Sequence, residues 1–182
     1  MLFRSTGLKD GDFKVINGDA QTKLNAVING QADALLGFVT DQVNQIESAT
    51  RKPVSAVLFA DHGVDNAGAS IVAHLDTLKN QPELVRRFMR AATLAMEDTE
   101  KNPEAAVEAL LKEFPKAGTP EALMSGLKTA IPLFHTADTR GQRPFRVSAK
   151  TMADTLATML QIGGIEASGA DASKYYTNDF LP

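Results

Sequence analysis

Hydrophobic positions divide the chain into two parts with different patterns. Before about residue 78, short apolar or alternating runs predict β-strands at residues 13–17, 34–39, 54–60 and 69–75. After that point, apolar residues recur every three or four positions, which is typical of amphipathic helices. The pattern therefore predicts an α/β part followed by an all-helical part.

Residues 23–42 combine both kinds of element and organise the first part. Apolar residues on one face predict a helix here, and Asp19 is suited to cap its start. Gly30 can end this helix in the left-handed conformation, and residues 34–39 follow as a buried strand. A loop at the carboxyl end of such a strand is a common place for ligand binding in α/β proteins.

Four helices are predicted in the second part, starting near Pro82, Asn102, Pro120 and Ser148. Proline is favourable in the first turn of a helix, where the N–H that it lacks would have no helical partner. The last segment, residues 171–182, is rich in aromatic side chains, and we expect it to dock on the rest of the chain.

Composition and charge exclude several classes of partner. The chain has 182 residues, of which 43% are hydrophobic and 23% charged, as is usual for globular proteins. The net charge of −3, with both signs scattered, offers no basic face for nucleic acid or for a membrane surface. No apolar run approaches the ~20 residues of a membrane span, and no export signal is seen.

Catalytic motifs are weak. The sequence has no cysteine, and its histidines, His62, His74 and His135, lack the spacing of known metal or nucleophile motifs. We interpret His74 as a structural strand residue, His135 as a cation at a helix end, and residues 97–100 as a solvated acidic face. We therefore expect no enzymatic activity, no metal and no cofactor.

Four motifs together carry a resemblance to a known family. They are NGQADALLGF, LFADHGVDNAG, the long helical segment from NQPELVRRF to ALLKEFP, and the closing YYTNDFLP. In this order they resemble the second half of a type II periplasmic substrate-binding protein of an ABC importer. The branch that they resemble is the thiamine-pyrimidine-synthesis-like group, which neighbours the nitrate, sulfonate and taurine binders.

The resemblance implies an incomplete α/β fold of the periplasmic-binding-protein-like II class. Residues 1–78 would be the second lobe, with a small mixed or parallel sheet lacking its first strand. Residues 79–182 would be the helical part that packs on the first lobe. Uncovered apolar faces and an open sheet edge then predict a homo-oligomer, such as a domain-swapped dimer. The family implies a periplasmic location, whereas the chain as written would remain cytoplasmic.

Two segments supply the candidate ligand-binding residues. By resemblance, Gly37 and Phe38 would end a strand at the cleft, although an aromatic residue there is also typical of a core. Thr40 and Asp41 could offer a hydroxyl group and a helix N-terminus to a polar ligand, or simply cap the helix.

The second segment contains Asp61, His62 and Asn66, which the resemblance places at a crossing between the lobes. A histidine beside an aspartate can bind a polar ligand or titrate near neutral pH. The alternative interpretation is a solvated turn.

These observations predict a solute-binding component of an ABC importer that binds a small molecule, such as a pyrimidine or a sulfonate, and works with an ABC permease. One alternative is a chain that binds no solute and persists as a structural homo-oligomer. Another is an enzyme of pyrimidine biosynthesis, but the related eukaryotic enzymes use a cysteine-rich motif and this chain contains no cysteine.

Overall fold

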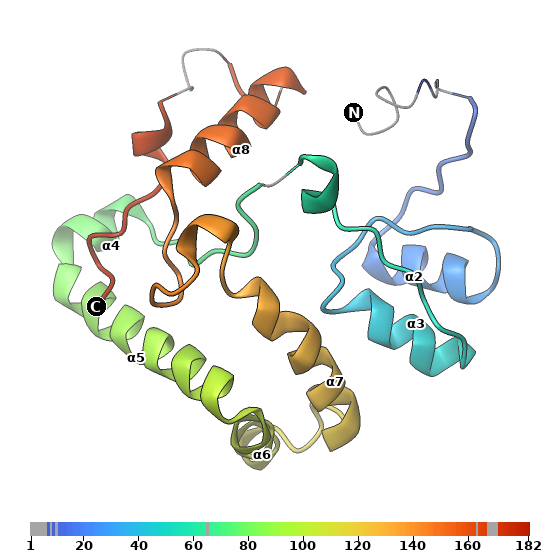
Figure 1. Cartoon of the computed structure of the whole chain (residues 1–182), viewed down its shortest axis with the longest axis horizontal. Helices are drawn as coiled ribbons and strands as arrows, with labels where there is room; N and C mark the ends of the chain where they lie inside the picture. The colour runs from blue at the N-terminus through green and yellow to red at the C-terminus, as the bar shows by residue number, and fades with distance from the viewer. Residues whose placement is uncertain (1–6, 8, 10, 65, 163, 167–170) are drawn as a thin grey trace. The chain divides into compact units, whose positions relative to one another are not determined.

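The computed structural model describes residues 7, 9, 11–64, 66–162, 164–166 and 171–182. Figure 1 shows that these residues form helices joined by turns and irregular segments. Contacts divide the chain into two compact units, Met1–Ala56 and Val57–Pro182. Each unit is described here by itself, and the predicted lobe boundary near residue 78 stays a prediction.

The first unit contains α2 (Ala20–Ile28) and α3 (Gln42–Thr50), which contact each other. The side chain of Asp19 caps α2, because its Oδ1 accepts a hydrogen bond of 2.7 Å from the backbone N–H of Thr22. Gly30 follows α2 with φ at +69°, so the predicted left-handed glycine is confirmed. The side chains of Leu24, Ala26 and Ile46 are buried.

The second unit contains α4 (Leu75–Asn80), α5 (Pro82–Lys101), α6 (Pro103–Glu113), α7 (Pro120–Ala130) and α8 (Ala149–Gln161). Short 3-10 turns lie before, between and after them: η1 (Ala60–His62), η2 (Ile131–Leu133), η3 (Ala137–Thr139) and η5 (Ala172–Lys174). Contacts join α4 to α5, α5 to α6 and α6 to α7. The buried apolar side chains of this unit are those of Met89, Val107, Met152 and Leu156.

The four helices predicted from Pro82 onward are confirmed as α5 to α8. Their starts follow from local chemistry, because α5, α6 and α7 each begin with a proline. The side chain of Asn102 accepts a hydrogen bond from Ala105 N at 3.1 Å, and that of Thr119 accepts one from Ala122 N at 3.2 Å. Ser148 caps α8 in the same way, with Thr151 N at 2.9 Å.

The predicted α/β fold, with a small mixed or parallel sheet, is wrong for the part of the chain that the structure describes. None of the four predicted strands forms a β-ladder there. A strand needs a neighbouring strand for its N–H and C=O groups, and local β-propensity does not supply one. Apolar residues of these segments are largely exposed instead, with Leu36 at 66% and Val72 at 90%.

Helix α4 replaces the end of the last predicted strand. His74 occupies its N-cap, and Nδ1 of this histidine accepts a hydrogen bond of 3.2 Å from the backbone N–H of Asp76. The interpretation of His74 as a strand residue is therefore wrong. Histidine is not one of the usual N-cap residues, so a helix start at residue 74 could not be predicted from capping preferences.

Candidate functional site

The first predicted binding segment is a turn that precedes α3. Backbone N–H groups of Asp41 and Gln42 both donate to Phe38 O, at 3.1 Å each. The side chain of Gln42 folds back over this turn: its Oε1 accepts a hydrogen bond of 2.6 Å from Phe38 N, and its Nε2 donates one of 2.5 Å to Asp41 Oδ2. One glutamine therefore fixes the turn that carries the candidate residues.

Gly37 is required by this arrangement. A Cβ atom at residue 37 would lie 2.5 Å from Gln42 Oε1, closer than two such atoms can approach. The side-chain oxygen would have to leave the N–H of Phe38. Gly37 thus allows the close approach of Gln42, a role that differs from the predicted contact with a ligand.

Phe38 is 71% exposed, so the alternative of a simple core residue does not describe it. Thr40 and Asp41 are exposed as well. Asp41 lies at the N-cap position of α3, but its carboxylate does not cap the helix backbone. Instead the carboxylate accepts hydrogen bonds from the side-chain amides of Gln42 and Gln45.

The second predicted segment begins with η1, where Asp61 and His62 lie exposed in one short turn. Gly63 ends this turn in the left-handed conformation, with φ at +79°. Asn66 is exposed and lies in an irregular segment. Asp61 and His62 are therefore consecutive exposed residues of one turn, and Asn66 follows four residues after His62.

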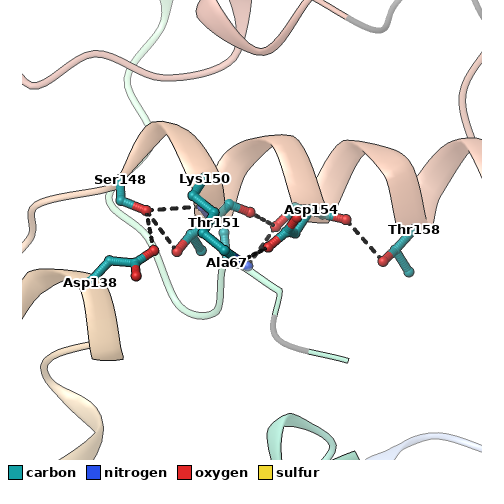
Figure 2. Close-up of polar contacts among 8 residues, drawn as sticks. Ala67, Asp138, Ser148, Lys150, Thr151, Asp154 and Thr158 are labelled. Carbon is teal, nitrogen blue, oxygen red and sulfur yellow. Dashed lines mark hydrogen bonds and ion pairs between the residues drawn. The ribbon is translucent and has the colours of Figure 1, made fainter. Parts of the chain in front are cut away.

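A hydrogen bond from Ala67, just after this segment, joins the chain to α8. The backbone N–H of Ala67 donates to Thr155 Oγ1 at 2.7 Å, and the hydroxyl group of Thr155 donates to Thr151 O at 2.8 Å. Figure 2 shows the segment passing beside the helix at this point. The position of the residue next to Asn66 is thus set by a threonine 88 residues later. Sequence analysis missed this anchor.

The start of α8 is held by a second polar contact. Besides capping the helix, the hydroxyl group of Ser148 donates to Asp138 Oδ2 at 2.9 Å (Figure 2). Asp138 belongs to η3, so this contact joins the helix to the preceding turn. The helix that anchors the segment 61–67 is therefore itself tied to its surroundings.

Two acidic residues near the end of α5 have basic partners, so the interpretation of residues 97–100 as a solvated face is wrong for them. Arg143 donates two hydrogen bonds to the carboxylate of Glu97, at 2.6 and 3.1 Å. These bonds lower the pKa of Glu97 and raise that of Arg143. Glu100 pairs with His135 at 2.8 Å, and both side chains are mostly buried.

The C-terminal segment docks on the rest of its unit, as predicted. The side-chain amide of Asn178 pairs with the backbone of Val147: its Oδ1 accepts from Val147 N at 3.2 Å, and its Nδ2 donates to Val147 O at 2.9 Å. Arg86 of α5 donates to Asp179 O at 2.5 Å, and its guanidinium lies 5.1 Å from the centre of the Phe180 ring. Figure 1 shows this tail, in red, beside α5.

The described residues form neither a metal cluster nor a membrane-spanning helix. No cluster of three or more metal-ligating side chains occurs in this part of the chain. None of the helices formed by these residues has the length and apolar character needed to cross a bilayer. The arrangement offers exposed aromatic and polar side chains for non-covalent binding.

Comparisons with known proteins place these segments in a family. The model of a family described as "NMT1/THI5 like" matches residues 1–106. The riboflavin-binding protein RibY of Chloroflexus aurantiacus is 26% identical over 164 residues, which cover 88% of this chain and 46% of that protein. The chain thus spans about half the length of this relative. No solved structure matches.

Both predicted binding segments, residues 37–41 and 61–66, lie within the matched region. The comparisons confirm the resemblance to substrate-binding proteins of ABC importers that the sequence motifs carry. More than half of the chain is matched, and the chain belongs to the NMT1/THI5-like family.

Proposed function

We propose that this chain is a solute-binding component of an ABC importer, and that it binds a small organic molecule with a flat ring. The observation that carries this proposal is the family match over residues 1–106, which includes both segments with exposed polar and aromatic side chains. A relative named as a riboflavin-binding protein supports a ligand of this kind. Pyrimidines belong to the proposed class of flat-ring ligands, whereas sulfonates are a competing ligand class.

Each segment, taken by itself, offers side chains that suit such a ligand. Phe38 presents an aromatic ring that is 71% exposed and can stack on a flat ligand. The hydroxyl group of Thr40 and the carboxylate of Asp41 can orient polar groups of the ligand. Asp61, His62 and Asn66 offer further hydrogen-bond partners on the second segment.

The mechanism that fits this family is selection of a closed form. A ligand has a higher affinity for the conformation in which it makes more contacts, so binding increases the population of that conformation. In this proposal an ABC permease recognises the closed form in the periplasm. The predicted homodimer stays a prediction.

Solute binding is better supported than the alternative function, an enzyme of pyrimidine biosynthesis. The family and the name of the relative both point to binding rather than to catalysis. The acidic side chains near the end of α5 form pairs within the fold, Glu97 with Arg143 and Glu100 with His135, which follows η2. A pyrimidine-biosynthesis activity therefore has no support from the residues described here.

Titration of the purified chain tests the proposal. Riboflavin, a hydroxymethylpyrimidine, taurine and nitrate are added separately, and binding is followed by calorimetry and by thermal stabilisation. We expect one compound to bind with saturation and to raise the melting temperature with its concentration, as mass action requires. The absence of binding by every compound would contradict the proposal for this chain.

A pair of variants locates the site. Phe38→Ala should raise the dissociation constant of the bound compound roughly tenfold, because a stacked ring contributes on the order of 1 kcal/mol or more. Phe114→Ala is the matched control, since Phe114 is also exposed, at 64%, and lies outside both segments. Equal effects of the two substitutions would remove Phe38 from the site.

A further inference from the structure

An arginine-rich pocket on the second unit is independent of the predicted binding segments. It has a volume of about 400 Å³ and is formed by parts of the chain that lie far apart in the sequence. Arg86, Arg90 and Leu94 come from α5, Arg143 from the segment before α8, and Phe180 and Leu181 from the C-terminal tail. None of these residues belongs to the predicted ligand-binding set.

The walls of the pocket are held in place by contacts already described. The pairing of Asn178 with Val147 fixes the tail, and the hydrogen bond from Arg86 to Asp179 O joins the tail to α5. The two hydrogen bonds from Arg143 to Glu97 hold that arginine on the same helix. Hydrogen bonds therefore hold all three parts of the pocket wall together.

The three arginines differ in how far their charges are compensated. Arg143 is paired with Glu97, and Nε of Arg86 lies 3.4 Å from Glu83 Oε1. Arg90 is exposed, and among the residues that the structure describes it has neither a hydrogen-bond nor an ion-pair partner. The pocket therefore contains one guanidinium group that is free to bind an anion.

The remaining lining is apolar. Phe180 presents a ring that contacts Arg86, and Leu94 and Leu181 add aliphatic surface. Pro182 also lines the pocket and adds apolar ring surface. A ligand that suits both kinds of surface has an anionic group joined to an aromatic or aliphatic body.

We propose that this pocket binds a small organic anion, with its carboxylate or phosphate group on Arg90 and the free N–H groups of Arg86, and its apolar part on Phe180. The planar guanidinium fork matches the oxygen pairs of both anions. The apolar body gains by leaving water for the surface of Phe180, Leu94 and Leu181. The site is separate from the segments of the proposed function and does not rest on it.

The test uses the full chain and four probes: benzoate, neutral benzamide of nearly the same size, phenyl phosphate, and inorganic phosphate without the ring. Binding is followed by backbone and arginine side-chain NMR signals during titration. We expect benzoate or phenyl phosphate to shift the signals of Arg90 and Phe180 with saturation at millimolar concentration. The affinity should fall as salt is added, because the interaction is electrostatic. Benzamide and inorganic phosphate should bind at least about tenfold more weakly.

Matched variants separate the pocket from general surface charge. Arg90→Gln should raise the dissociation constant about tenfold, because charge-assisted hydrogen bonds are lost. Arg87→Gln is the control: Arg87 lies on the same helix, is exposed and has no partner among the described residues, but it does not line the pocket. Phe180→Leu should weaken phenyl phosphate while leaving inorganic phosphate unchanged.

Three results would overturn the proposal. Equal weakening by Arg90→Gln and Arg87→Gln would show binding to the surface charge of α5 in general. Benzamide as effective as benzoate would remove the anionic requirement, and inorganic phosphate as effective as phenyl phosphate would remove the apolar one. Should Arg90→Gln fail to fold, the salt dependence and the benzamide comparison on the unmodified chain decide the question by themselves.

Discussion

Two regions of the second unit use similar apolar residues with different results. From α5 to α8, the backbone forms hydrogen bonds within each helix, and Met89, Val107, Met152 and Leu156 are buried. Between residues 57 and 74, here called the irregular region, the described residues form no regular element apart from η1, and Val57 and Val72 are 67% and 90% exposed. A helix completes its own hydrogen bonds within four residues, whereas an extended segment needs a partner.

This difference determines how much each apolar residue contributes to stability. Removing an apolar side chain from water stabilises the fold by roughly 25 cal/mol per Å² of buried surface. A valine that is 90% exposed gains almost none of this energy. We therefore expect substitutions in the helical region to lower stability and similar substitutions in the irregular region to leave stability nearly unchanged.

The largest effect is expected in the core. Leu156→Ala removes a side chain that is only 6% exposed and should lower the free energy of unfolding by about 2–5 kcal/mol. Val72→Ala, in the irregular region of the same unit, should change the free energy of unfolding by about 0.5 kcal/mol or less. Urea unfolding followed by circular dichroism measures both. A comparable loss of stability in Val72→Ala would mean that the side chains of the irregular region are packed.

A smaller effect is expected at a helix start. Ser148→Ala removes the cap of α8 and the hydrogen bond to Asp138, and should lower the free energy of unfolding by about 1 kcal/mol. Ser70→Ala, in the irregular region, removes a hydrogen bond of 3.2 Å to Gly68 O and should lower the free energy of unfolding by about 0.5 kcal/mol or less. The same urea series compares them. If the two variants lose equal stability, the capping contact is not what distinguishes the regions.

The smallest effect concerns the point where the two regions meet. Thr155→Val removes the acceptor for the backbone N–H of Ala67, and hydrogen exchange of that amide should speed up roughly fivefold, the equivalent of about 1 kcal/mol. Thr158→Val is the control, because its hydroxyl group bonds only to Asp154 O within α8. Unchanged exchange at Ala67 in Thr155→Val would show that other contacts hold the segment.

The helical elements could be predicted because their signals are local. Prolines in the first turns of α5, α6 and α7, and caps such as Asn102 and Ser148, lie within a few residues of the groups that they serve. The predicted strands lacked such support. Their apolar runs are equally compatible with extended segments that have no ladder, and only the position of another segment decides between the two.

The candidate binding residues were predicted from their places at the end of an expected strand and at a crossing between lobes, but the contacts that hold them were not predicted. Gln42 folds over the turn at Phe38, and a glutamine in a helix gives no sequence signal for this. Thr155 is 88 residues away from Ala67, and Arg143 is 46 residues away from Glu97. Such pairings depend on tertiary structure, and no spacing rule in the sequence reveals them.

The turn held by Gln42 has a consequence for how binding preferences can change. The hydrogen bonds that join Phe38, Asp41, Gln42 and Gln45 each span at most four positions. These contacts hold the turn through residues that are close in sequence. We therefore expect that Phe38 and Thr40 can be exchanged to change the binding preference while Gln42 keeps the backbone of the turn in place.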